Sequence, residues 1–327
     1  MQKIIRGLEE APREDGSTAR GALAALTALG LAGPRAGSSI ARCSGIKILL
    51  TSLVSSQFLS GHLRCSSLRA LASVCCCLEA VDCFINDGGP EILTDILISD
   101  DTPLNEKSEA AALLVQIISP WMDFAGLPYV EGYSHLLVPA LTELAEKCSC
   151  SQTLLLATAG LNYLSRAKRG SAMIIENDSV KKILRCVKRS AADSIWLMEQ
   201  VASMIGQLAR DPKHRAHLAE ARASVALVCF LRMQPPGLEQ EYKKLVETTT
   251  EALTRLCVDQ EIAKQVVALG GSNCITIDEQ KSPDLSNKES DKDKTRNHSK
   301  ATKSLRMARR IAAEQIDIAR ICDSSPG

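Results

Sequence analysis

Five apolar helical stretches of this sequence each contain one polar side chain, and the five recur at similar intervals. They are Ser73, Gln116, Asn162, Gln207 and Arg255. An amide offers both a donor and an acceptor, which suits the main chain of an extended peptide. If the stretches lie side by side, these residues form a ladder that lines a peptide-binding groove. The alternative is that each one bonds to neighbouring backbone, as isolated buried polar residues do. Their repetition favours the groove.

A basic cluster is the second candidate site. Its members are Arg166, Lys168, Arg169, Lys181, Lys182, Arg185, Lys188 and Arg189. Such a run is usually a solvated face, here offset only by Glu176 and Asp178. A docking patch for an acidic or phosphorylated peptide is the sharper alternative, because these cations bind such anions strongly. Nucleic acid is a third alternative, which the scarcity of interleaved aromatic residues disfavours.

The sequence contains no motif for catalysis or metal binding. It has no Gly-rich phosphate loop, no GxSxG elbow and no HExxH. His214 and His217 lie near Asp211, but Lys213 and Arg215 beside them indicate an ordinary helix start. The CCC and CSC runs at 75–77 and 148–150 lack histidine partners at zinc-ligand spacing. We expect no catalytic residues, no metal and no cofactor.

Composition indicates a water-soluble protein whose cysteines are free thiols. The formal charge is +1, so no global field attracts nucleic acid or acidic membranes. Most of the thirteen cysteines lie inside helical patterns, where a free thiol behaves as a small apolar residue. The apolar run at 22–32 follows acidic residues instead of the basic start of a signal peptide, and no apolar run is long enough to span a bilayer. These features predict a cytoplasmic protein without nucleic-acid partners or membrane insertion.

The clearest element that could position the ladder runs from residue 133 to residue 167. In its first half, Leu137, Leu141 and Leu144 form one apolar stripe. Its second half, residues 154–164, is apolar nearly all round and should be buried on most of its surface. Such a two-helix unit cannot close its own core, so it needs similar units on either side.

Similar units recur along the chain. The last apolar anchors of their first helices are Leu53, Leu97, Leu141, Val187 and Leu231. The second helices contain residues 69–75, 112–118, 159–165, 203–209 and 251–257. A period in the mid-forties is typical of armadillo and HEAT repeats. We therefore predict an all-α, armadillo- or HEAT-like right-handed α-solenoid of about five repeats. Asn162, the third residue of the ladder, lies in the second helix of the third repeat. The alternative is five unrelated helical hairpins.

Composition shifts divide the chain into four parts. Residues 1–42 form an N-terminal cap or partial repeat, and residues 43–271 the repeat domain. Residues 272–304 form a polar linker, which we expect to be disordered because it can bury little apolar surface. Residues 305–327 contain an amphipathic helix and a tail. We interpret this helix as a C-terminal cap, and a free arm that binds a partner is the alternative.

Several segments together resemble a known family. They are LRALASVCCCLEAV (68–81), KSEAAALLVQIISPWMDF (107–124), QTLLLATAGLNYLS (152–165), the stretch 199–231 and QEIAKQVVALGG (260–271). The resemblance is to the armadillo-repeat domain of Inscuteable homologues and covers roughly residues 43–271. The SPW and RALASVC segments are not general armadillo features. Asn162 matches the asparagine with which armadillo repeats bind peptide backbone.

The resemblance implies a non-enzymatic adaptor in asymmetric cell division. Such an adaptor links the Bazooka-type cortical Par scaffold to the Pins/LGN-type spindle-orientation machinery at the apical cell cortex. The family's binding peptide for the LGN-type TPR protein lies N-terminal to the armadillo region, so we expect this chain to lack that contact. An armadillo or HEAT carrier in trafficking or nuclear transport, and an enzyme subunit or regulator, are the alternative functions.

Overall fold

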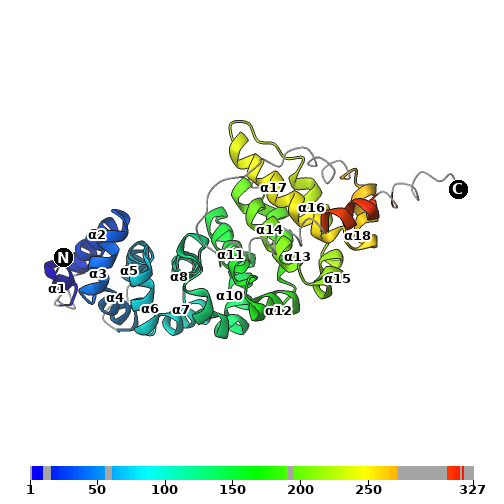
Figure 1. Cartoon of the computed structure of the whole chain (residues 1–327). Coiled ribbons are helices and arrows are strands. Elements are labelled where there is room, and N and C mark those ends of the chain that lie inside the picture. The colour runs from blue at the N-terminus through cyan, green and yellow to red at the C-terminus, as the bar shows by residue number, and fades with distance from the viewer. Residues whose placement is uncertain are drawn as a thin grey trace, which may run out of the picture. The chain divides into compact units, whose positions relative to one another are not determined.

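The computed structural model describes residues 2–9, 16–55, 61–190, 194–271, 308–316 and 319. Every regular element in this part of the chain is a helix, and this part contains no strand (Figure 1). The all-α class predicted from the sequence is confirmed. No helix in the described ranges is long and apolar enough to cross a membrane. The expected linker, residues 272–304, lies outside the described residues.

The helices from α3 onward form five triplets, each with a short first helix and a long third helix. The first helices are α3 (Pro34–Arg42), α6 (Leu78–Asn86), α9 (Leu127–Val130) with the 3-10 turn η3 (Glu131–Tyr133), α12 (Lys168–Glu176) and α15 (Pro212–Glu220). The second helices are α4 (Gly45–Val54), α7 (Gly89–Ile98), α10 (Ser134–Lys147), α13 (Ser179–Ser190) and α16 (Ala223–Phe230). The third helices are α5 (Gly61–Val74), α8 (Leu104–Ile117), α11 (Ser151–Leu164), α14 (Ile195–Leu208) and α17 (Glu239–Leu256).

Further helices flank the triplets. Helices α1 (Gln2–Glu9) and α2 (Gly16–Leu31) precede the first triplet, and α18 (Gln260–Ala268) follows the last. A unit of three helices is typical of armadillo repeats, whereas HEAT repeats have two. The repeats are therefore of the armadillo type.

The two-helix unit expected from the sequence misses the short first helix of each repeat. In the first repeat, α5 ends at Val74 and α6 begins at Leu78, so residues 68–81 contain a break between two helices. The break lies at Cys77, whose backbone is extended with φ −144° and ψ 156°. It contains neither glycine nor proline, the residues that usually mark such ends. Composition alone therefore gives no signal for it.

A left-handed residue separates the first and second helices in four of the triplets. These residues are Ser44, Gly88, Asp178 and Arg222, with φ between 54° and 81°. Gly270, with φ 67°, takes the same place after α18. The residue that follows each turn is small, because space is short there. A Cβ at Gly89, for example, would lie 2.5 Å from the Phe84 ring.

Three of the five apolar anchors predicted for the core are buried in the second helices. Leu53, Leu97 and Leu141 are buried. Val187 and Leu231 are half-buried, so their prediction as core residues is wrong. Val187 precedes the charged last turn of α13, and Leu231 lies one residue beyond the end of α16. Apolar spacing places a side chain on one face of its helix but does not say how completely that face is covered.

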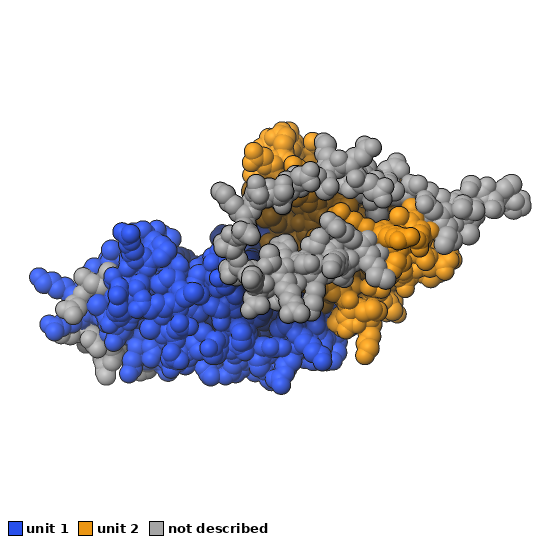
Figure 2. Space-filling view, in the orientation of Figure 1, with its two compact units in different colours: residues 1–186 blue, residues 187–327 orange. Residues whose placement is uncertain are grey.

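The chain has two compact units, residues 1–186 and 187–327 (Figure 2). In the first unit, α2 packs along α5, α5 along α8, and α8 along α11. In the second unit, α14 packs along α17, and α16 contacts both α17 and α18. The second unit also contains a helix over residues 308–316, which is the described part of the C-terminal helix expected from the sequence. Ala312 and Ile316 of this helix are fully buried. Ala319, which follows it, is 3% exposed.

A test of this core uses two neighbouring residues of α4. Leu53 is 3% exposed and Val54 is 67% exposed. We expect Leu53→Ala to lower the free energy of unfolding by about 2–5 kcal/mol, because it leaves a cavity in the packed core. Val54→Ala should change it by less than about 0.5 kcal/mol. Urea unfolding followed by circular dichroism measures both, and equal effects of the two substitutions would contradict this packing.

Candidate functional site

Helices α2, α5 and α8 carry three matching stripes of exposed and half-buried residues. On each helix they recur at i, i+4, i+7 and i+11, the spacing of one helix face. The stripe on α2 is Arg20, Ala24, Thr27 and Leu31. The stripe on α5 is His62, Ser66, Arg69 and Ser73, and that on α8 is Asn105, Glu109, Ala112 and Gln116. We call these twelve residues the third-helix face of the first unit, because α2 packs on α5 as α5 packs on α8.

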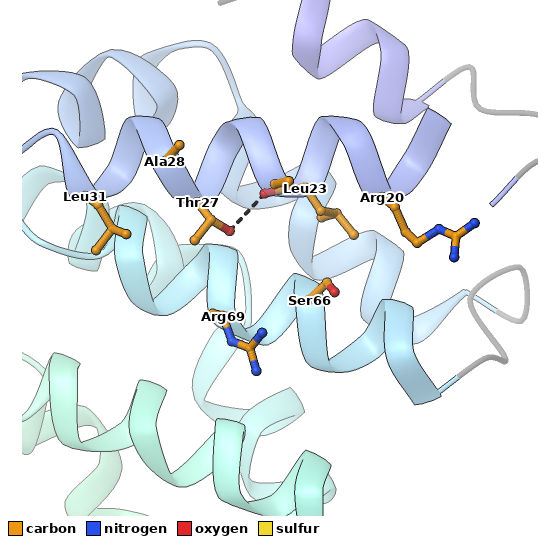
Figure 3. A pocket seen from close by; sticks show the side chains of 8 residues that line it. Arg20, Leu23, Thr27, Ala28, Leu31, Ser66 and Arg69 are labelled. Atoms are coloured by element: carbon orange, nitrogen blue, oxygen red, sulfur yellow. Dashed lines mark hydrogen bonds between the residues drawn. The ribbon is translucent and has the colours of Figure 1, made fainter. Parts of the chain in front are cut away.

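Two pockets lie next to each other on this face. One has a volume of about 320 Å³ and runs along α2, with Leu23, Ala28 and Leu31 among its apolar lining (Figure 3). The other has a volume of about 490 Å³ and reaches from α2 across α5 to α8. Arg20, Ser66 and Arg69 line both pockets. The two pockets therefore form one hollow surface with an apolar end and a polar end.

The charge of this surface is set by an ion pair between α5 and α8. The Arg69 guanidinium donates to Glu109, and this hydrogen bond raises the pKa of Arg69. The Arg69 side chain is 60% exposed, whereas that of Glu109 is 22% exposed. Arg69 extends from α5 towards α8 in Figure 3. An incoming group therefore meets the guanidinium before it meets the carboxylate.

A second ion pair holds α5 and α8 together beneath the surface. Arg64 Nε donates to Glu106 Oε2 at 2.8 Å, and the Glu106 side chain is almost fully buried. Asn105 Nδ2 also donates to Cys65 Sγ at 3.3 Å. Burial is the main cause that raises the pKa of the Cys65 thiol, followed by Glu106 and Glu109. Charge-assisted bonds of this kind fix the spacing of the two helices.

Three members of the predicted ladder use their polar groups on backbone. Gln116 Nε2 donates to Cys75 O at 3.2 Å, just past the end of the preceding third helix. Arg255 Nη1 donates in the same way to Gly206 O at 2.8 Å. Ser73 Oγ donates to Ala70 O on its own helix. These three residues therefore make the side-chain to backbone hydrogen bonds that are the alternative to a peptide-binding ladder.

The other two ladder members have different surroundings. Asn162 is 2% exposed, so its amide is buried, whereas Gln207 is half-buried. Gln207 and Arg255 belong to the second unit, and the other three belong to the first. The peptide-binding role of the ladder stays a prediction.

The residues of the basic cluster lie on two elements. Arg166, Lys168 and Arg169 are exposed around the start of α12, where the Arg169 amide donates to Glu131 Oε1 at 3.3 Å. The other five lie on α13, where Arg185 pairs with Glu146 at 3.7 Å and Lys182 Nζ donates to Asn177 Oδ1 at 3.4 Å. Lys181, Lys188 and Arg189 are exposed on the same helix. A docking role for these residues stays a prediction.

Sequence reasoning missed two features of the surface. The first is the stripe on α2, because residues 1–42 were interpreted only as a cap or partial repeat. Its signal is the helical spacing of Arg20, Ala24, Thr27 and Leu31. The second is an aromatic cluster, described next, whose signal is the local concentration of aromatic residues in a chain with only 3% of them.

The aromatic cluster joins the end of α11 to the turn after α8. Tyr163 lies edge-on to Trp121 and Phe124, with ring centroids 6.5 and 6.2 Å apart. The Arg166 guanidinium lies 4.7 Å from the centre of the Phe124 ring. Trp121, in the 3-10 helix η2 (Pro120–Met122), is 64% exposed. Asp123 and Phe124 have positive φ, which strains residues other than glycine.

The described residues contain no group of three or more potential metal ligands. Asp211 accepts a hydrogen bond from the Lys213 amide and caps α15, so the Asp211 and His214 pair belongs to a helix start, as expected. Burial raises the pKa of Cys257 to about 12 and also raises that of Cys75. Cys150 differs, because backbone amides of Thr153 and Gln152 at the start of α11 lower its pKa.

The ladder geometry predicts that Gln116 stabilises the fold. Gln116→Ala removes the bond to Cys75 O and should lower the free energy of unfolding by about 0.5–1.5 kcal/mol. Gln152 is exposed on α11, so Gln152→Ala is a matched control that should have almost no effect. Urea unfolding of both variants is the measurement. An unchanged stability of Gln116→Ala would show that this bond contributes nothing.

The cysteines should differ in their reaction with iodoacetamide. Cys150 is exposed and has a lowered pKa, so more of it is thiolate near neutral pH, and it should react first. Cys75 and Cys257 are buried with raised pKa values and should react last. Peptide mass mapping after timed alkylation gives the order. Early modification of Cys75 in the folded protein would contradict its burial.

The sequence matches one protein family and two named relatives. The family described as "Protein inscuteable C-terminal" matches residues 1–294. Protein inscuteable homolog of Mus musculus is 24% identical over 211 residues, which are 62% of this chain and 36% of that protein. The Homo sapiens homolog is also 24% identical, over 215 residues with the same coverage. The chain thus spans about a third of the length of these relatives.

Solved structures support the fold. A designed armadillo repeat protein in complex with peptide (KR)4 has a TM-score of 0.59 and 16% identity, over 76% of this chain and 98% of that one. Computationally designed armadillo repeat proteins for modular peptide recognition give a TM-score of 0.58 with the same identity and coverage. These likenesses show an armadillo-type α-solenoid. Because the family model matches residues 1–294, this chain belongs to the Inscuteable C-terminal family.

Proposed function

We propose that this chain is a non-enzymatic adaptor of cell polarity. Its partner is an extended segment of a Bazooka-type scaffold of the Par complex, bound on the third-helix face of the first unit. Through this contact the protein links the cortical Par complex to spindle orientation at the apical cortex of dividing cells. Membership of the Inscuteable C-terminal family supports the polarity role.

The observation that carries the binding site is the pair of adjoining pockets over α2, α5 and α8. Their combined surface is long, hollow and shared between three helices, which suits an extended chain better than a compact small molecule. Leu31 supports the same conclusion, because it is 75% exposed at the apolar end. Large exposed apolar side chains beside polar groups are typical of contact surfaces.

One solved structure with a similar fold contains a bound peptide. The designed armadillo protein described above is in complex with peptide (KR)4. We transfer to this chain only the binding of an extended peptide and not the preference for lysine and arginine. Here two arginines, Arg20 and Arg69, line the pockets.

The test is titration calorimetry of the whole chain against a fragment of a Bazooka-type scaffold. Leu31→Ser should weaken binding by about tenfold or more, because burial of a leucine side chain contributes about 1.5–3 kcal/mol. Leu78, on the first helix α6, is 51% exposed and provides the control variant Leu78→Ser. That variant should bind as the unchanged protein does.

Two results would contradict the proposal. Loss of binding in Leu78→Ser with normal binding in Leu31→Ser would place the site on another face. Failure of the unchanged chain to bind any part of the scaffold, together with binding of a nuclear-import or trafficking cargo, would favour the carrier function instead.

A further inference from the structure

Helix α13 differs in charge from the second helices of the other repeats. Its sequence contains no acidic residue and includes the five cations Lys181, Lys182, Arg185, Lys188 and Arg189. Helices α4 and α10 each contain one lysine, and α7 and α16 contain neither lysine nor arginine. All five helices bury an apolar side in the same place of their repeat. The fold therefore does not require a basic second helix.

Two of these cations lie where they destabilise the helix. Lys181 and Lys182 are the third and fourth residues of α13, close to the positive end of the helix dipole, where acidic side chains are favoured. In α7 the third residue is an acid, Glu91. The basic residues at the start of α13 are thus in an unfavourable place, unlike those in its last turn.

Like charges also lie next to each other along α13. Arg185 stands three or four residues from each of the other four cations, and like charges at this spacing on a helix repel. Arg185 pairs with Glu146 at 3.7 Å, which compensates part of its own charge. Lys181, Lys182 and Lys188 form no ion pair with the described carboxylates. The helix therefore carries uncompensated positive charge at a cost in stability, which is typical of a functional surface.

The start of α13 is closed to a compact anion such as a phosphate group. Ser179 and Val180 are fully buried, so the backbone amides of this first turn are covered. The Ser179 hydroxyl is also occupied, because it accepts from Asn177 Nδ2 at 3.1 Å and lies 2.8 Å from Thr142 Oγ1. An anion on this helix must therefore meet the lysine side chains and not the helix end.

The lysines are spread along the helix. Lys181 and Lys188 lie two turns apart on one side, about 10.5 Å along the axis, and Lys182 lies beside Lys181. One small anion cannot contact both ends of this row. In an extended peptide every second side chain points the same way, about 6.6 Å from the next. Three such carboxylates span about 13 Å, which covers the row, and the side chains between them face solvent.

Helix α13 lacks the side chains that other anionic partners need. None of the large exposed apolar residues of the described chain lies on it, so it has nothing to insert into a lipid surface. Its sequence contains no aromatic residue on which a base could stack. These absences favour a peptide over a membrane or a single-stranded nucleic acid.

We propose that the exposed side of α13 is a second docking surface, which binds an extended partner segment with aspartate or glutamate at every second position. The carboxylates pair with Lys181, Lys182 and Lys188, and binding relieves the repulsion within the helix. This inference does not rest on the proposed function, because α13 lines neither of the two pockets that define that site.

The test uses three labelled peptides of equal length with the whole chain. They alternate Ser with Glu, with Gln and with Lys, and fluorescence anisotropy measures their binding at low salt. The Glu–Ser peptide should bind, the other two should not, and added salt should weaken the binding because it screens exposed charges. Equal binding of the Glu–Ser and Gln–Ser peptides would overturn the inference.

Two matched variants locate the surface. Lys181→Glu should weaken binding of the Glu–Ser peptide by about tenfold, the value of one charge-assisted hydrogen bond. Lys47 is exposed and is likewise the third residue of its second helix, α4. Lys47→Glu makes the same change in net charge and should leave the affinity within about twofold. Equal losses in both variants would mean that only the overall charge matters and would overturn the inference.

The stability of Lys181→Glu provides a second readout. The substitution puts an acid at the start of α13 and places it four residues before Arg185, a favourable ion-pair spacing. The urea midpoint should therefore rise while peptide binding falls. A lower midpoint together with lost binding would mean that Lys181 serves the fold, and would overturn the inference.

Two further measurements exclude other occupants. Vesicles that contain phosphatidylserine should not bind through this surface. If they bind, lose binding in Lys181→Glu, and the Glu–Ser peptide does not bind at all, the surface belongs to a membrane and the inference is overturned. Leu31→Ser, which disturbs the pocket along α2, should leave binding of the Glu–Ser peptide unchanged. Loss of binding in that variant would place the peptide in the pockets and would also overturn the inference.

Discussion

Four of the five repeats of this protein depend on a sharp turn between their first and second helices. The residue at the turn is left-handed in four of the five triplets, at Ser44, Gly88, Asp178 and Arg222. Only glycine reaches that conformation without cost, so the three other residue types are strained. The next residue must be small because the first helix lies against it, as the close approach of Phe84 to Gly89 demonstrates. This turn sends the second helix back over the first, and the third helix can then pack against the same helix of the neighbouring repeat.

The packed third helices give the surface its charge through differences in burial. The pair of Arg69 and Glu109 is neutral in sum, yet its two members are covered to different degrees. The carboxylate lies against α8 and the guanidinium extends over the pocket, so the pair contributes a positive surface. Formal charge counted along the sequence is +1 for the whole chain and contains no hint of this local asymmetry.

The sequence predicted the fold class and the repeat length, because both depend on the spacing of apolar residues. Two of the left-handed turn residues, Gly88 and Gly270, are glycines, the residue type that marks such a turn in a sequence. The sequence did not reveal the short first helices, since the break at Cys77 depends on tertiary packing and not on a residue with a special backbone preference. Val187 and Leu231 were misjudged because periodicity places an apolar side chain on a helix face and does not say how completely that face is covered.

The candidate site was harder to predict than the fold. Gln116 and Arg255 stand where a ladder was expected, but Gln116 bonds to a carbonyl just past the end of the preceding third helix and Arg255 to a carbonyl within it. Sequence spacing places a side chain on a face and does not say which neighbour it bonds to. The stripe on α2 was available in the sequence, yet its role follows only once α2 is known to pack along α5 as the other third helices do.

Both tryptophans of the sequence are exposed, Trp121 by 64% and Trp196 by 50%, and they belong to different compact units. An indole in contact with water emits at longer wavelength than one in a core and is accessible to collisional quenchers. Each unit therefore has a natural optical probe. Replacing either tryptophan by phenylalanine would leave a single emitter, and each unit could then be followed separately without a chemical label.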